Sequence, residues 1–92
     1  MKIYTIDLND IFNADELHRA IRKELPLPAH YGNNLDALYD VLTEWIEEVT
    51  IVFLNVDEAE VTMPKYMKAL RRMCEDIQQE NPNIHIQFGA LS

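Results

Sequence analysis

The sequence TIVFLN, residues 50–55, is an apolar, β-branched run with the length of one strand. A strand of this composition is buried on both faces when it belongs to a parallel sheet. Two other stretches have the alternating period of a strand, Lys2 to Leu8 before this run and Ile84 to Phe88 after it. We therefore expect three strands in the chain.

Helical spacing of apolar residues marks the segments between the strands. Asn13 opens the first helix with Glu16 three residues later, the pattern of a capping box, and the prolines of LPLP end it. Asn33 or Asn34 is expected to cap a second helix that runs to about Ile46, with its leucines facing the core. Two helices therefore separate the first strand from the second.

A third long helix precedes the last strand. Thr62 is expected to cap it, with Pro64 in its first turn, and residues 57–60 before it form a loop or a single helical turn. Strands separated by helical crossovers pair in parallel with right-handed connections. The sequence thus predicts an α/β fold, with a three-stranded parallel sheet packed against three to four helices, in a single domain over residues 1–92 that ends in a short tail from Gly89.

Composition restricts the cellular location and the class of partner. Cys74 is the single cysteine, and the N-terminus lacks the basic and apolar regions of a signal peptide, so we expect a cytoplasmic protein without disulfides. The apolar runs are too short to span a bilayer, so no membrane segment is expected. Sixteen acidic residues against eight basic ones give a net charge of −8, which argues against nucleic acid as a ligand and for a positively charged partner.

Catalytic, metal and cofactor sites are not predicted. The two glycines fit no phosphate-binding loop, the histidines at positions 18, 30 and 85 fall in separate elements and are expected to be incidental, and Cys74 lies on an apolar helix face. The acidic stretch Asp7 to Glu16 lacks the glycine and the ligands of a calcium loop. Nothing separates the environments of Asp36 and Asp40, as a general acid and base would require. We expect neither an enzyme nor a bound cofactor.

Charge is distributed unevenly along the chain. All eight lysines and arginines lie outside the segment from Glu24 to Pro64, whereas nine acidic residues lie within it. In this segment Asp36 and Asp40 are four residues apart on one helix, where like charges repel by roughly 0.2–0.5 kcal/mol and the Cβ atoms are about 5–6 Å apart. One interpretation is a solvated acidic face that keeps the protein soluble. The other is a surface built for a basic partner.

The second interpretation gives the exposed side of this helix a definite chemistry. The residues opposite the leucine stripe are Asp36, Tyr39, Asp40, Thr43 and Glu44. Two carboxylates beside an aromatic ring imitate a short piece of nucleic-acid backbone with a stacked base. A basic site that binds nucleic acid would accept this helix as a mimic.

The run HYGNNLDALYDVLTEW, residues 30–45, resembles the central motif of the barstar family. The members of this family are small cytoplasmic bacterial proteins that inhibit secreted ribonucleases such as barnase by filling the active site. The preceding KELPLP and the layout of the whole chain are similar to that family as well. The resemblance implies the same parallel sheet with helices, and a one-to-one complex with a basic ribonuclease.

The resemblance also implies which residues bind the partner. Asp40 matches the family's principal carboxylate, which enters the phosphate-binding pocket of the nuclease, and Asp36 matches a carboxylate that contacts a further arginine. Asp76, on the third long helix, falls where the family carries a more distant glutamate. The rest of the family's binding loop and helix is matched by Tyr31, Gly32, Asn34, Leu35, Thr43 and Trp45. Trp45 is equally well explained as a core residue.

Three positions depart from the family pattern. His30 stands where the family has a tyrosine, Tyr39 replaces a tryptophan, and Glu44 replaces a glycine. The Glu44 carboxylate would crowd a partner that packs closely there, which points to a target other than barnase itself. An imidazole becomes charged near pH 6.5, so His30 would then place a cation beside the acidic face.

Other functions could use the same surface. An acidic immunity or adaptor module would bind a basic protein that is not a ribonuclease. A metal-dependent enzyme using Asp36 and Asp40 would be stabilised by magnesium or manganese, an effect that we do not expect. We expect the free protein to be a monomer.

Overall fold

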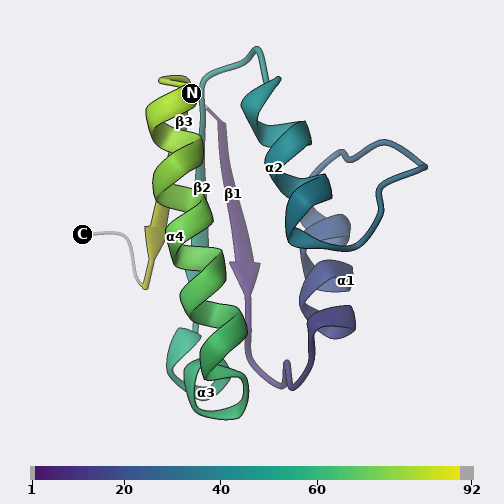
Figure 1. The fold of residues 1–92 in the computed structure, drawn as a ribbon, viewed down its shortest axis with the longest axis vertical. Coiled ribbons are helices and arrows are strands. Elements are labelled where there is room, and N and C mark those ends of the chain that lie inside the picture. Colours follow the sequence, from purple (N-terminus) through teal and green to yellow (C-terminus); the bar gives the residue numbers. More distant parts are fainter. Residues whose placement is uncertain (1, 90–92) are drawn as a thin grey trace.

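A computed structural model describes residues 2–89, which form three strands and four helices (Figure 1). In chain order these are β1 (Lys2–Asp7), α1 (Ala14–Glu24), α2 (Leu35–Thr43), β2 (Val49–Leu54), α3 (Val56–Thr62), α4 (Pro64–Glu80) and β3 (Ile84–Phe88). The strand order is β1-β2-β3, and both pairs are parallel. The predicted α/β fold is therefore confirmed. The expected tail beyond Gly89 lies outside the described residues.

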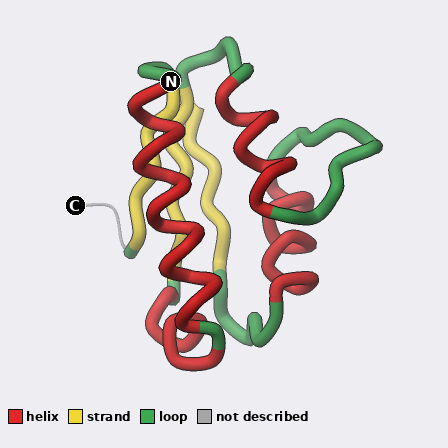
Figure 2. The backbone as a smooth tube through the Cα atoms, viewed as in Figure 1, coloured by secondary structure: helices red, strands yellow, loops and turns green. Residues whose placement is uncertain are grey.

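The sheet has one face covered by helices and one exposed face. Alternate residues of the edge strands are buried, Ile6 in β1 and Ile84 and Ile86 in β3, and the residues between them are exposed. Helices α1, α2 and α4 lie on the same side of the sheet (Figure 2). The middle strand β2, which has a strand on each side, is buried on both faces from Val49 to Phe53, so the exposed residues of the second face belong to the edge strands.

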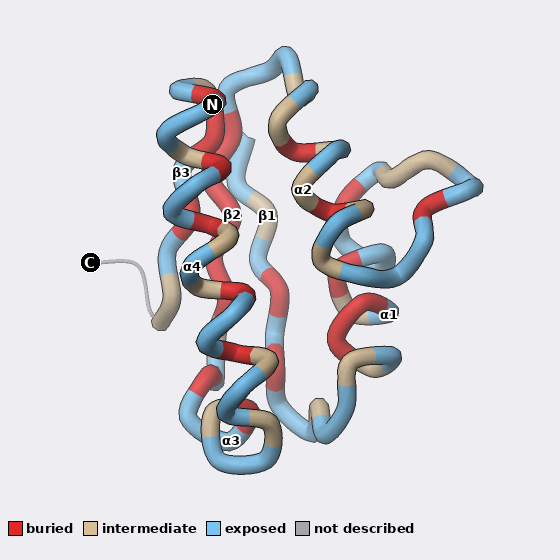
Figure 3. The backbone as a smooth tube through the Cα atoms, viewed as in Figure 1, coloured by how far each residue is buried: buried red, intermediate tan, exposed pale blue. Residues whose placement is uncertain are grey.

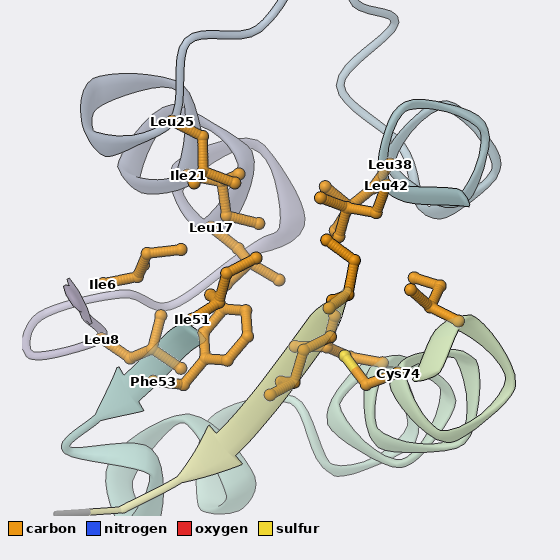
Figure 4. Close-up of a cluster of buried hydrophobic side chains, with 14 of the residues drawn as sticks. Ile6, Leu8, Leu17, Ile21, Leu25, Leu38, Leu42, Ile51, Phe53 and Cys74 are labelled. Atoms are coloured by element: carbon orange, nitrogen blue, oxygen red, sulfur yellow. The ribbon is translucent and has the colours of Figure 1, made fainter. Parts of the chain in front are cut away.

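The hydrophobic core lies between the sheet and these helices, and each helix shows its buried positions on the side facing the strands (Figures 3 and 4). Side chains less than 2 % exposed come from the sheet and from the helices: Ile6, Leu17, Ile21, Leu38, Leu42, Ile51, Leu70 and Ile77. Burying one such side chain stabilises the fold by about 1.5–3 kcal/mol. Cys74 belongs to this core, and burial raises the pKa of its thiol to about 12.

The predicted cap of α1 is present. Asn13 Oδ1 accepts a hydrogen bond from Glu16 N at 2.9 Å, as in a capping box. The Glu16 carboxylate reaches back one residue further than the motif requires and accepts from Phe12 N at 3.0 Å. The local sequence therefore fixes the start of this helix.

Helix α2 is shorter than predicted, since it ends at Thr43 and not near Ile46. The side-chain amide of Asn81 binds the chain at this end. It donates to the carbonyl oxygens of Leu42 at 2.9 Å and of Trp45 at 2.8 Å. Carbonyl oxygens at the end of a helix lack partners within the helix, and here a side chain from another segment supplies the donor.

The prediction of a Thr62 cap was wrong. Thr62 is the last residue of α3, and its hydroxyl donates to the carbonyl oxygen of Glu58 at 3.1 Å. Residue Met63 precedes α4 without a side-chain capping bond, and Pro64 occupies the first turn as predicted. Residues 57–60, expected to form a loop or a single helical turn, belong to α3, a helix of seven residues.

Candidate functional site

Helix α2 is positioned by its cap and by two leucines. Asn34 Oδ1 accepts from Ala37 N at 2.8 Å, and Asn34 Nδ2 donates to the carbonyl oxygen of Gly32 at 3.1 Å. Leu38 and Leu42 are buried against the core. The opposite side of the helix must therefore face outward. The two hydrogen bonds of the Asn34 side chain connect the loop before α2 to the first turn of the helix.

Asp36 and Asp40 lie on this outward side and are both exposed. Neither carboxylate has a hydrogen bond or an ion pair with any other residue in the range 2–89. Asp36 lies in the first turn of α2, where the helix dipole stabilises a negative charge. The two aspartates thus form an acidic surface that the described chain does not neutralise.

A small hollow lies beside Asp40. It has a volume of about 130 Å³ and is lined by Pro28, His30, Tyr31, Gly32, Ala37, Asp40 and Val41. The lining comes from the loop before α2 and from α2 itself. The structure therefore brings together four residues that the sequence assigned to partner binding: His30, Tyr31, Gly32 and Asp40.

A second, shallower hollow continues this surface. It has a volume of about 380 Å³ and is lined by Pro28, Val41, Glu44, Trp45, Ile46 and Glu47. Pro28 and Val41 line both hollows, so the two are adjacent. Ile46 is 88 % exposed, which places a large apolar side chain beside the carboxylates of Glu44 and Glu47.

Four predicted site residues are only half-buried and belong partly to the core: Leu35, Tyr39, Thr43 and Trp45. The Thr43 hydroxyl donates to the carbonyl oxygen of Tyr39 at 2.8 Å. The Trp45 ring packs edge-on against Tyr4, with 6.3 Å between ring centroids. These residues can support a partner surface while also packing against the core.

Tyr31 and Asp76 differ from the other predicted site residues in what they can contribute. Tyr31 is only 5 % exposed, so its ring points into the protein, and what it can contribute is the position of its loop. Asp76 is exposed in the second half of α4 and lines neither hollow. The acidic surface and the two hollows are therefore assembled without it.

His18 was expected to be incidental, but it is fully buried and contacts the loop before α2. Its Nδ1 is 2.7 Å from the Tyr31 hydroxyl, and its Nε2 is 2.6 Å from the Tyr66 hydroxyl. The sequence contained a signal, since position 18 lies three residues before Ile21 and seven before Leu25 on the buried stripe of α1.

Arg22 is a second contact of this loop that the sequence did not reveal. Its Nη1 donates to Asn33 Oδ1 at 3.4 Å, and Asn33 adopts a left-handed backbone with φ of 54°. Asparagine tolerates this conformation better than most residues. The loop is thus attached to α1 at two positions, Tyr31 and Asn33.

Two structural features would indicate membrane or metal binding in the described residues, a helix that could cross a membrane and a cluster of metal-binding side chains. Among residues 2–89, no helix has the length and apolarity needed to cross a bilayer. The same residues contain no group of three histidine, cysteine or acidic side chains that could hold a metal ion.

The fold and this surface define a small α/β protein with an exposed acidic helix beside a hollowed loop. Residues 1–91 match the model of the family described as "Barstar (barnase inhibitor)", and the chain belongs to this family. It is similar to the Bacillus subtilis protein named "Putative ribonuclease inhibitor YrdF", with 32% identity over 81 residues, which cover 87% of this chain and 89% of that protein. The resemblance seen in the sequence is thereby confirmed.

Proposed function

We propose that this protein inhibits a basic bacterial ribonuclease by covering its active-site cleft with α2 and the loop at residues 26–34. The observation that carries the proposal is the pair Asp36 and Asp40, exposed on one side of a helix and without a cation partner within residues 2–89. Family membership supports the proposal. The family is described as "Barstar (barnase inhibitor)", and the Bacillus subtilis relative is named as a putative ribonuclease inhibitor.

In this mechanism the carboxylates take the place of nucleic-acid phosphates. Asp40 fills the phosphate subsite of the nuclease, Asp36 pairs with an arginine beside it, and no reaction takes place on this chain. An exposed ion pair contributes about 0–1 kcal/mol, whereas two charges 4 Å apart at an effective dielectric constant near 20 interact by about 4 kcal/mol before desolvation. Only a closed, complementary pocket gives the larger interaction, which favours a target with a deep basic cleft.

The departures from the family pattern determine the choice of target. Glu44 lies at the end of α2 and lines the hollow next to Trp45, so it adds a carboxylate where the family has a glycine. We propose that the target provides a cation or extra space there and is a ribonuclease other than barnase. The inhibitor acts in the cytoplasm, as a monomer that forms a one-to-one complex.

Titration of nuclease activity tests this function. Increasing amounts of the protein are added to each of several basic bacterial ribonucleases, and RNA cleavage is measured at each ratio. We expect cleavage by at least one of them to stop at an equimolar ratio. A basic protein without nuclease activity, added in excess as a competitor, should not restore cleavage. Restoration by that competitor would instead indicate an acidic immunity or adaptor module with another target.

A further inference from the structure

A buried hydrogen-bonded chain links three separate parts of the structure. His18 of α1 is fully buried, with Tyr31 Oη 2.7 Å from its Nδ1 and Tyr66 Oη 2.6 Å from its Nε2. The His18 ring also packs against both phenol rings, with centroid distances of 5.8 Å and 6.0 Å. The imidazole therefore joins α1 to the loop before α2 and to α4.

The geometry suits a neutral imidazole. A neutral ring has one N–H donor and one bare nitrogen, so it can donate to one tyrosine hydroxyl and accept from the other. A charged ring has two donors and no acceptor, so one tyrosine hydroxyl would lose its acceptor. Protonation would also place a charge in a site with no exposure to water.

The surrounding charges do not remove this preference for the neutral ring. Burial lowers the pKa of His18, and the nearby Asp15 of α1 raises it by less. Burial likewise raises the pKa of Tyr31 and of Tyr66, so both phenols stay protonated, although Arg22 opposes the shift at Tyr31. The groups that act on the imidazole are thus Asp15 from its own helix and the two phenols.

The loop attached to this chain carries the candidate site. Tyr31 lies between His30 and Gly32, and these three residues line the hollow beside Asp40. The Tyr31 amide donates to the carbonyl oxygen of Pro28 at 3.0 Å, which closes the loop on itself. A shift of the Tyr31 ring would therefore move the wall of the hollow against which a partner of Asp40 must fit.

We propose that His18 is a positioning residue for the partner-binding loop, which its neutral ring holds in place by linking Tyr31 to Tyr66. Acid conditions then loosen residues 26–34 and speed the release of the target. The effect on target release rests on the proposed function, whereas the effect on the loop does not. The two effects can therefore be measured separately.

The Tyr66→Phe variant tests the link from its far end, since it removes one hydroxyl on α4 and leaves the loop sequence intact. Amide hydrogen exchange at Tyr31, corrected for intrinsic rates, measures the opening of the loop. We expect opening at pH 7 to increase about 3- to 10-fold, the effect of losing one hydrogen bond. In the wild-type protein, opening should also increase between pH 7 and pH 5, and in His18→Gln it should not depend on pH over this range.

The Ile84→Val variant serves as the control for a purely structural role. Ile84 is buried in β3, so the substitution lowers the melting temperature without touching the chain of three rings. Equal loop opening in Tyr66→Phe and Ile84→Val would overturn the proposal, as would a wild-type opening that does not change with pH.

Target release gives an independent measurement. If the wild-type protein inhibits a ribonuclease, the complex with Tyr66→Phe should dissociate about 3- to 10-fold faster than the complex with Ile84→Val. Equal dissociation rates would overturn the positioning role while leaving the inhibitor function intact. If no ribonuclease is inhibited, the proposed function fails, and the exchange experiment alone decides the role of His18.

Discussion

Asp40 combines three properties at one position. Its carboxylate is exposed, it has no cation partner within residues 2–89, and it lies at the edge of the hollow formed with the loop before α2. A carboxylate without an ion pair in the free protein can pair with a cation of the partner, at the cost of losing its bound water. The structure thus gives Asp40 the surroundings expected of a central contact, although the contact itself stays a prediction.

Replacing Asp40 by alanine should weaken the complex with the target by about 2–5 kcal/mol, the usual cost of truncating one partner of a buried charge pair. Most of the loss should appear as faster dissociation, because the nuclease cations would be left buried and unpaired. Stopped-flow mixing and competition with unlabelled inhibitor give the two rate constants. Asp57→Ala, which removes an exposed carboxylate from α3, is the control and should change affinity little.

His18 also makes stability depend on pH. Its pKa is lowered in the folded protein by burial, whereas in the unfolded chain it has the ordinary value of 6.5. Above pH 6.5 the ring is neutral in both states. Below it, the unfolded chain binds a proton that the folded protein resists, so the free energy of unfolding falls as the pH drops.

We therefore expect urea denaturation to require less urea at pH 5.5 than at pH 7.5, and this difference to shrink in His18→Gln. His30 and His85 are retained in the variant, so the change between the two proteins isolates the buried ring. An unchanged pH dependence in His18→Gln would contradict this account.

Helix α2 shows which element boundaries a local sequence can predict. Asn34 caps its first turn with a residue of its own segment, and the sequence indicated that start. The end at Thr43 depends on Asn81, which is nearly forty residues away and is not visible in the local pattern. The same reason explains Tyr31, whose burial depends on His18 and Tyr66.

The strands could be predicted from the local sequence, whereas the hollow beside Asp40 could not. Alternation and β-branching predicted β1, β2 and β3 within one residue at each end, because strand periodicity is a local property. The hollow beside Asp40 could not be predicted, since it depends on how the loop folds over α2. Comparison with the family pattern singled out four of its lining residues, His30, Tyr31, Gly32 and Asp40, but not the inward position of Tyr31.

Asn81 provides a test at the level of the helix. Asn81 is 6 % exposed, and Asn81→Ala would leave the buried carbonyl oxygen of Leu42 and the partly buried one of Trp45 without this donor. We expect a loss of about 1–3 kcal/mol in the free energy of unfolding. Asn83→Ala removes a more exposed bond to the carbonyl oxygen of Ile46 and should cost less in the same urea titration. Equal costs would show that Asn81 does not determine where α2 ends.

Over the whole molecule, charge is separated between helices. The net charge is −8, and α2 carries no lysine or arginine, whereas α1 and α4 carry seven of the eight cations: Arg19, Arg22, Lys23, Lys65, Lys68, Arg71 and Arg72. Helix α3 also carries acidic residues and no lysine or arginine, so an approaching basic protein is attracted towards α2 and α3 rather than towards α1 and α4. Such attraction raises the rate of association more than it slows dissociation.

Salt should therefore slow association with the nuclease steeply while changing dissociation little, because the Debye length falls from about 10 Å at 0.1 M to about 3 Å at 1 M. The variants Asp36→Asn and Asp57→Asn distinguish the effect of charge at α2 from the effect of the net charge on the association rate. Each removes one negative charge from the first turn of a helix, α2 in one case and α3 in the other. If the field at α2 directs the encounter, Asp36→Asn slows association at low salt more than Asp57→Asn does. Equal slowing would mean that net charge alone attracts the nuclease, and the position of the acidic helix would then have no role in the encounter.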